Sequence, residues 1–224
     1  YPTVCKNLNT DHGSLLRIYE EARQVPGIKH CFIGSGIRYD LCLSDTGNKE
    51  VDKTNRRYLE TVIRHHVSGR FKVAPEHCSP TVLGLMRKPA FGLFQQLKSI
   101  FDEINRKHRL NEQIIPYFIS SHPGCRPEDM AELAVATKAL DFKLEQVQDF
   151  TPTPMTVATT IYYSGYHPYS LQKIDTAKSE KEKKQQNMFF FWYKREFREQ
   201  IMTLLRRIHR ADLIPKLYGK EREK

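Results

Sequence analysis

The 224-residue chain is long enough for one sizeable hydrophobic core or two small ones, and its 39% hydrophobic and 11% aromatic residues are typical of a globular protein. Its apolar run from Met188 to Tyr193, six residues long, is far short of the ~20 that cross a bilayer, and no signal-peptide pattern opens the chain. Seven of the ten net positive charges lie between Gln172 and Lys224, which predicts a nearly neutral body with a basic C-terminal appendage.

The cysteines are few and widely separated. They stand at Cys5, Cys31, Cys42, Cys78 and Cys125. An odd, scattered set favours reduced thiols in the cytoplasm over a disulfide framework. No two cysteines have the close spacing of zinc or iron–sulfur loops. We therefore expect a cytoplasmic protein in which this chain alone builds no metal site.

Along the first three quarters of the chain, short apolar segments alternate with segments of helical period. Segments rich in β-forming residues and bounded by turn residues predict strands at Ile28–Ser35, Phe71–Ala74, Ile114–Ser120 and Leu144–Phe150. Apolar stripes predict helices over Ser14–Gln24, over Asp52–Val67, from Leu93 to Ile104, and from Pro127 to Leu140. Glu128 and Asp129 lie in the first turn of the last helix, where the helix dipole favours acidic side chains.

This alternation is typical of parallel βαβ units and predicts an α/β fold. About four such units are too few for an eight-stranded barrel. They are compatible with a small open sheet or with the second part of a barrel whose first strands lie upstream. The chain has no initiator methionine and begins in a loop-like stretch, which favours the second arrangement. We expect residues 1–155 to form a partial parallel (β/α) barrel and residues 156–224 to form a basic, mostly helical region.

The pattern changes after Phe150. Two prolines in Thr151–Pro154 predict a loop that leaves a strand end. Thr159–Ser164 has the composition of an edge strand or hairpin arm, and a charged stretch from Ser170 to Gln186 has helical character. A long amphipathic helix is predicted beyond it, with an apolar face of Phe189, Tyr193, Phe197, Ile201, Leu204, Leu205 and Ile208 and an opposite face of Arg195, Arg198, Arg206 and Arg210.

Polar turns follow all four predicted strands, at Gly34–Asp40, Ala74–Ser79, Ser120–Cys125 and Phe150–Pro154. Because ligands bind at the carboxyl ends of parallel strands, four such turns on one rim predict a binding site.

Each turn also has a purely structural reading. Gly34 and Gly36 suit a tight turn, and Arg38 and Asp40 suit an ion pair. Ser79 suits the N-cap of a helix that begins at Pro80.

The histidines and remaining polar residues give no positive sign of a metal or nucleophile. His122 and Cys125 resemble half of a metal site without the remaining ligands. His65 and His66 lie on a predicted helix and are expected at the surface. No Ser/His/Asp or Cys/His arrangement follows from the spacing, so nucleophilic catalysis has no support.

Several motifs together resemble one family. The run from Phe71 to Pro89, FKVAPEHCSPTVLGLMRKP, resembles the fourth-strand segment of radical SAM proteins. ISSHPGC, which ends at Cys125, resembles their fifth-strand turn, and VQDFTPTPM, which ends at Met155, resembles their sixth-strand exit. With SGIRYD before these motifs and YYSGYHPY after them, the chain resembles YgiQ-like radical SAM proteins over nearly its whole length.

The resemblance implies a parent enzyme with a partial TIM barrel that holds S-adenosylmethionine and a 4Fe–4S cluster. The Cys-x₃-Cys-x₂-Cys loop that holds such a cluster is absent here, so the resemblance implies the C-terminal part of the enzyme, inactive alone and partnered by the N-terminal part of the same polypeptide. Carried over by position, Glu76 and Ser79 would face the ribose or carboxylate of the cofactor, with Ser35 and Arg38 nearby. The other residues carried over are Ile119 and Ser120 beside the adenine, and Phe150 and Thr151 closing the pocket.

Three points stay open in this interpretation. Cys125 replaces a commoner glutamate, which leaves the role of the fifth-strand turn undecided, and no substrate is named by any motif. The alternative function is a nucleic-acid-binding module that acts through Arg198, Arg206 and Arg210 beside the aromatic run. We also expect self-association, because the first strand of a partial barrel has an unpaired edge.

Overall fold

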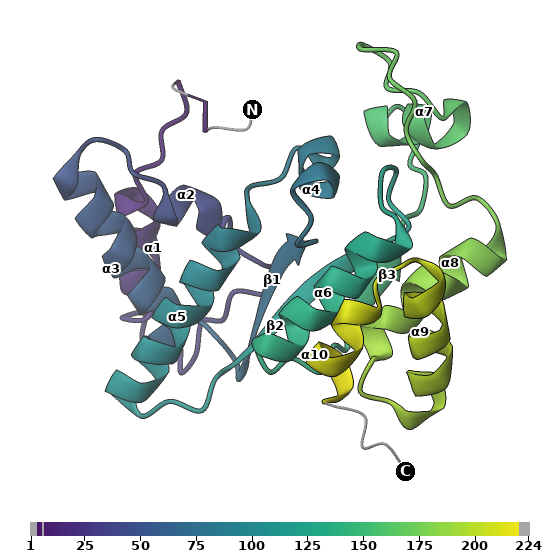
Figure 1. Ribbon diagram of the computed structural model, residues 1–224. Coiled ribbons are helices and arrows are strands. Elements are labelled where there is room, and N and C mark those ends of the chain that lie inside the picture. Colours follow the sequence, from purple (N-terminus) through teal and green to yellow (C-terminus); the bar gives the residue numbers. More distant parts are fainter. Residues whose placement is uncertain (1–3, 6, 220–224) are drawn as a thin grey trace. The chain divides into compact units, whose positions relative to one another are not determined.

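The computed structural model describes residues 4, 5 and 7–219 and has an α/β fold with a small parallel sheet of three strands in the order β1-β2-β3 (Figure 1). The chain divides into two compact units. The first comprises residues up to Ala74 together with Pro89–Pro116, and the second comprises Pro75–Lys88 and the residues from Tyr117 onward.

In the first unit, helices α1 (Gly13–Ala22), α2 (Tyr39–Leu43), α3 (Lys49–His65) and α5 (Phe91–His108) enclose an apolar core. The predicted stripes of α3 and α5 are confirmed, because Leu59 and Val62 of α3 and Leu97 of α5 are buried. The stripe predicted for α1 is wrong, because Leu15 and Ile18 are exposed and Leu16 is buried instead. The side chain of Asn48 begins α3 by accepting hydrogen bonds from the amides of Glu50 and Val51. Phe71 of β1 stacks on Phe101 of α5 with the ring centroids 5.6 Å apart.

Three of the predicted strands are confirmed as β1 (Arg70–Glu76), β2 (Gln113–Ser120) and β3 (Gln146–Asp149). In β1, buried and exposed side chains alternate, as expected for a strand with one face on the core. Strands β2 and β3 are parallel, and their register places Ser120 beside Asp149. The last residues of the two strands therefore lie next to each other.

The prediction of a strand at residues 28–35 is wrong. The segment forms no regular strand, and Ile28 and Phe32 are half exposed. A strand requires a neighbour that satisfies its backbone groups in a ladder. Here the amide of Ile33 donates to the carbonyl of His66 at 2.9 Å, and no strand of the described part of the chain pairs with the segment.

The second unit contains most of the helices that follow the strands along the chain. They are α4 (Pro80–Met86), α6 (Pro127–Ala139), α7 (Val157–Ser164), α8 (Glu180–Asn187), η1 (Met188–Phe191), α9 (Arg195–Arg207), η2 (Ala211–Leu213) and α10 (Ile214–Tyr218). The predicted start of α6 is confirmed, with Pro127 at its first position and the carboxylate of Asp129 accepting from the amide of Arg126 at 2.9 Å. Ser79 occupies the N-cap position of α4, but its side chain makes no capping hydrogen bond.

Three predictions for the C-terminal region need correction. Residues 159–164 belong to helix α7 rather than to a strand, because the hydroxyl of Thr156 caps the helix and Ile161 and Tyr162 turn into the core. The charged stretch is helical only from Glu180, where Ser179 and Glu182 form a capping box.

The long amphipathic helix is interrupted between Phe191 and Arg195. Met188, Phe189 and Phe190 are all buried, and consecutive residues of one α-helix face in different directions. The 3₁₀ turn η1 brings all three into the core, and the amphipathic pattern resumes in α9. Among the described residues, no helix combines the length and the apolar character that crossing a membrane requires.

Candidate functional site

A pocket of about 510 Å³ lies in the second unit, at the carboxyl ends of the three strands. The ends of the strands contribute Glu76, Ile119 and Asp149 to its lining. Phe150 and Thr151, from the loop after β3, complete this side, and the segment that follows α4 supplies Lys88. The volume is within the usual range of small-molecule sites, and the lining combines apolar surfaces with a few charged groups.

Glu76, the last residue of β1, is held in an unusual and buried position. Its φ angle of 65° is in the left-handed region, which costs free energy in a residue with a Cβ atom and is frequent at binding sites. Its Oε1 pairs with Lys88 Nζ at 2.9 Å. Its Oε2 is buried and has no hydrogen-bond partner among the described residues. A buried carboxylate oxygen in this state is suited to accept a hydrogen bond from a ligand.

Asp149, at the end of β3, is a second carboxylate that lines the pocket. Its Oδ1 accepts hydrogen bonds from Ser120 Oγ and, at 3.1 Å, from Asn187 Nδ2. The amide of Phe150 donates to the carbonyl of Ser120 at 2.8 Å and continues the pairing of the two strand ends. Sequence reasoning named Ser120 and Phe150 here but missed Asp149 between the strand and its turn.

The turn after β2 is packed against the rest of the second unit by a buried glutamine. Gln186 of α8 accepts from the amide of Ser121 at 2.7 Å and donates to the carbonyl of Cys125 at 2.8 Å. His122, in the same turn, lines the pocket and meets Phe150 edge-on with the ring centroids 5.0 Å apart. Burial lowers the pKa of His122, which favours a neutral, aromatic surface at this wall.

His77 and Cys125 are buried, Cys78 is half-buried, and all three are uncharged at neutral pH. His77 Nδ1 accepts from the amide of Ser79 at 2.9 Å, and its Nε2 lies 3.5 Å from Cys125 Sγ. Burial lowers the pKa of His77 to about 4 and raises that of Cys78 to about 12. Burial also raises the pKa of Cys125 far above its ordinary value. A neutral imidazole beside protonated thiols does not form an activated nucleophile.

The residues predicted to bind a cofactor fall into three groups. The first group lines one pocket and consists of Glu76, Ile119, Phe150 and Thr151. Ser120 is not part of the lining, but its hydroxyl donates a hydrogen bond to Asp149, which is. Ser79 lies at the start of α4 and is not part of the lining.

Ser35 and Arg38 belong to the first unit. Ser35 borders a separate hollow of about 230 Å³, and Arg38 makes a two-point ion pair with Asp40, as one reading of the sequence proposed. Gly36 serves a close approach rather than a tight turn, because a Cβ there would lie 3.0 Å from the carbonyl oxygen of Lys72.

The prediction that His65 and His66 both lie at the surface is wrong for His66. Its ring is fully buried, and Nδ1 donates to the carbonyl of Cys31 at 2.6 Å. No cluster of three or more His, Cys, Asp or Glu side chains suited to a metal ion occurs within the described ranges.

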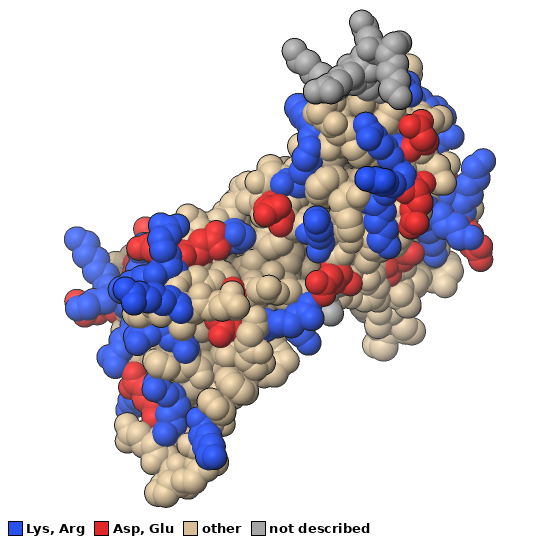
Figure 2. Space-filling model, turned by 90° about the horizontal axis from the view of Figure 1, so that it is seen from below, with Lys and Arg blue, Asp and Glu red and all other residues tan. Residues whose placement is uncertain are grey.

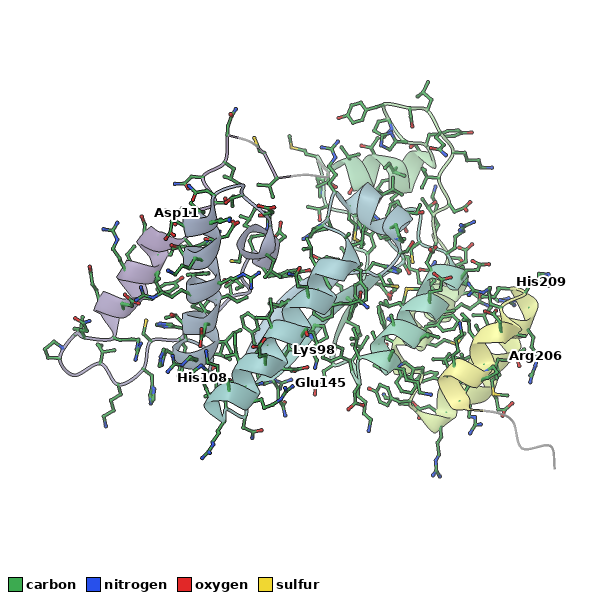
Figure 3. All side chains as sticks on the ribbon, turned by 60° about the vertical axis from the view of Figure 1, so that its left-hand side comes forward. Asp11, Lys98, His108, Glu145, Arg206 and His209 are labelled. Carbon is green, nitrogen blue, oxygen red and sulfur yellow. The ribbon has the colours of Figure 1, made fainter. Side chains whose placement is uncertain are left out.

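Two of the three arginines named for a nucleic-acid interface, Arg198 and Arg210, have partners within the protein. Phe189 and Phe190 are buried in the core. The guanidinium of Arg198 lies over the ring of Tyr218, and Arg210 pairs with Asp212 and Glu132. Arg206 lies near the end of α9 (Figure 3). On the face drawn in Figure 2, Lys and Arg side chains lie among Asp and Glu side chains rather than in a single basic field.

Comparisons with known proteins find relatives over nearly the whole chain. Residues 145–221 match a family model described as Domain of unknown function (DUF3362). A UPF0313 protein of Bacteroides thetaiotaomicron is 60% identical over 220 residues, which cover 98% of this chain and 36% of that protein. A UPF0313 protein of Porphyromonas gingivalis is 57% identical, with 98% of this chain and 35% of that protein covered. One from Methanocella arvoryzae is 42% identical over 214 residues, with 96% and 34% covered.

These similarities agree with the resemblance to YgiQ-like proteins at the level of the UPF0313 proteins. The chain spans about a third of the length of the curated relatives it matches. The names of these relatives state no cofactor, substrate or reaction.

Proposed function

We propose that the chain is the C-terminal portion of a radical SAM enzyme and forms one wall of its S-adenosylmethionine pocket. The observation that supports this most is the convergence of three strand ends on one pocket, which Glu76, Ile119 and Phe150 line together. Ligands of parallel α/β folds bind at this edge of the sheet. The similarity to UPF0313 proteins, together with the YgiQ-like motifs, gives the pocket a specific candidate ligand.

The residues present fit an adenosyl group. Ile119 and Phe150 supply apolar surfaces for a purine ring, and the unpartnered Oε2 of Glu76 supplies an acceptor for a hydroxyl or ammonium donor. Lys88, which is part of the lining, supplies a positive charge for a carboxylate. The strand ends hold these groups in place, so binding requires little rearrangement of the backbone.

The bound cofactor and its cluster would supply one-electron chemistry, and this chain would contribute binding and orientation. The five cysteines do not have the spacing of a cluster loop, and Cys78 and Cys125 are protonated by burial. We therefore place the cluster ligands in the part of the longer protein that this chain does not span. The longer relatives are expected to contain Cys-x₃-Cys-x₂-Cys, and relatives without it would contradict the enzymatic half of the proposal.

Binding of S-adenosylhomocysteine to the 224-residue chain, measured by isothermal titration calorimetry, tests the proposal. We expect Glu76→Gln to weaken binding about tenfold, because a charged acceptor becomes a neutral one. Thr151→Trp should abolish binding by filling the pocket. Glu199→Gln is the matched control, since it removes a carboxylate from the exposed side of α9. Absence of binding, or equal affinities in Glu76→Gln and Glu199→Gln, would contradict the proposal.

A further inference from the structure

We propose that Asp149 binds the vicinal hydroxyl groups of a ribose in the strand-end pocket, and that Asn187 positions Asp149 for this task. The inference rests on the proposed function, because it names how the same pocket holds its ligand. It adds a binding residue that the motifs did not indicate. It also assigns a role to helix α8, which lies in the region matched by the family model at residues 145–221.

The two oxygens of the Asp149 carboxylate have different surroundings. Oδ1 accepts from Ser120 Oγ and from Asn187 Nδ2, the latter at 3.1 Å. Oδ2 makes no hydrogen bond to any of the residues that the structure describes. One oxygen thus anchors the carboxylate, and the residue lines a pocket of about 510 Å³. An anchored carboxylate with an open acceptor is suited to hydroxyl donors.

The neighbours of Asp149 favour a ribose over other ligands that carry hydroxyl donors. Ile119 and Phe150 line the same pocket and provide apolar surfaces for the base that a ribose carries. The side chain of Gln148 accepts a hydrogen bond from the hydroxyl of Tyr117 and is therefore already engaged. An acidic residue at the carboxyl end of a parallel strand binds ribose hydroxyls in dinucleotide-binding folds for the same physical reason.

Asn187 is fixed by the residue that precedes it. Gln186 is 3% exposed and bridges the amide of Ser121 and the carbonyl of Cys125, which belong to the turn after β2. The end of α8 is therefore attached to the second strand end, and Asn187 reaches the third. Two consecutive side chains of α8 thus fix the distance between the turn after β2 and the end of β3. Removal of the Asn187 amide would leave Ser120 as the remaining donor to Asp149 Oδ1.

The experiment compares adenosine with 2′,3′-dideoxyadenosine as probes for the full 224-residue chain, with affinities from NMR titration. We expect the unmodified chain to prefer adenosine about tenfold, and Asp149→Asn to abolish the preference. Asn187→Ala should reduce it about threefold without change in the thermal unfolding midpoint. In the Asp149→Asn background, Asn187→Ala should have no further effect on the preference, which a general loosening of the fold would not produce.

Two control variants and the contrary outcomes complete the test. Asp175→Asn removes a carboxylate of the same unit, and Gln185→Ala shortens a neighbouring side chain of α8; both should keep the preference for adenosine. A preference that survives Asp149→Asn would overturn this inference while adenosine binding, and with it the proposed function, stands. A preference for adenosine in Asn187→Ala that equals that of the unmodified chain would overturn the positioning role. Failure of the unmodified chain to bind either nucleoside would overturn both proposals.

Discussion

Residues 28–38 and residues 113–125 have the same kind of sequence: an apolar run followed by a turn with glycine, serine and charged or imidazole groups. The second segment folds into β2 and its turn, and Phe118 at its centre is fully buried. The first segment stays irregular, with Phe32 49% exposed. The same pattern therefore has two outcomes in one chain.

The difference shows that a strand is a property of a pair of segments. Strand β2 has β1 on one side and β3 on the other, so its backbone groups are satisfied in two ladders. Residues 28–35 have no such neighbour within the part of the chain that the structure describes. Apolar composition alone does not make a buried strand of a segment that no neighbouring strand pairs with.

Truncation of one phenylalanine in each segment should produce the largest contrast. Phe118→Ala removes a fully buried ring and is expected to lower the free energy of unfolding by about 3–5 kcal/mol. Phe32→Ala removes a half-exposed ring and should cost less than about 1 kcal/mol. Urea unfolding followed by circular dichroism measures both. Equal losses in the two variants would show that residues 28–35 are packed as a core strand.

The region around the strand ends also differs from residues 28–38 because it buries an ionisable group, His77. The stability of the protein should therefore fall in acid. Burial is the main cause of the lowered pKa of His77, the nearby His122 lowers it further, and Asp129 opposes the shift. Since the folded pKa is about 4 and the unfolded value about 6.5, the unfolded chain binds the proton first as pH falls. His77 should therefore leave stability unchanged at neutral pH and reduce it between pH 6.5 and 4, by about 3 kcal/mol in all.

Urea unfolding of the wild type and of His77→Gln across this pH range checks the expectation. The variant loses the acceptor for the amide of Ser79 and should be less stable at pH 7. The difference between the two proteins should narrow as the pH approaches 4. A constant difference across the range would mean that His77 does not titrate on unfolding.

Local patterns predicted most of the elements near the site. The stripe of α3, the Pro127 start of α6 and the three strands followed from periodicity and capping chemistry. Helix α7 was misread because Val157, Thr159, Thr160 and Ile161 are β-branched, and such residues favour strands. The Thr156 cap and the burial of Ile161 and Tyr162 outweigh that preference.

The pocket was predictable in outline because the carboxyl ends of parallel strands share one edge of a sheet. Its anchoring contacts were not. Asn187 reaches Asp149 across 38 positions of sequence, and Gln186 reaches Ser121 across 65. No spacing rule connects such pairs. Between Asp149 and Asn187 the chain passes through a loop, α7, a second loop and α8, and between Ser121 and Gln186 it also passes through α6 and β3. An aspartate directly before the Phe150 turn was the one local signal available.

Residues 28–35 of the first unit lead to a last prediction, which concerns the free energy of self-association and has the smallest expected effect. Ile28 and Phe32 are 50% and 49% exposed, and the backbone around them lacks a strand partner in the described structure. An extended apolar segment of this kind pairs readily with another chain. We expect concentration-dependent self-association in sedimentation velocity, weakened about tenfold in Ile28→Lys/Phe32→Lys, because charges that meet across a paired edge repel each other. Lys53→Glu, an exposed change on α3, is the charge control. A monomer at all concentrations would show that the missing strand partner leaves no adhesive edge, and the contrast with β2 would then rest on burial alone.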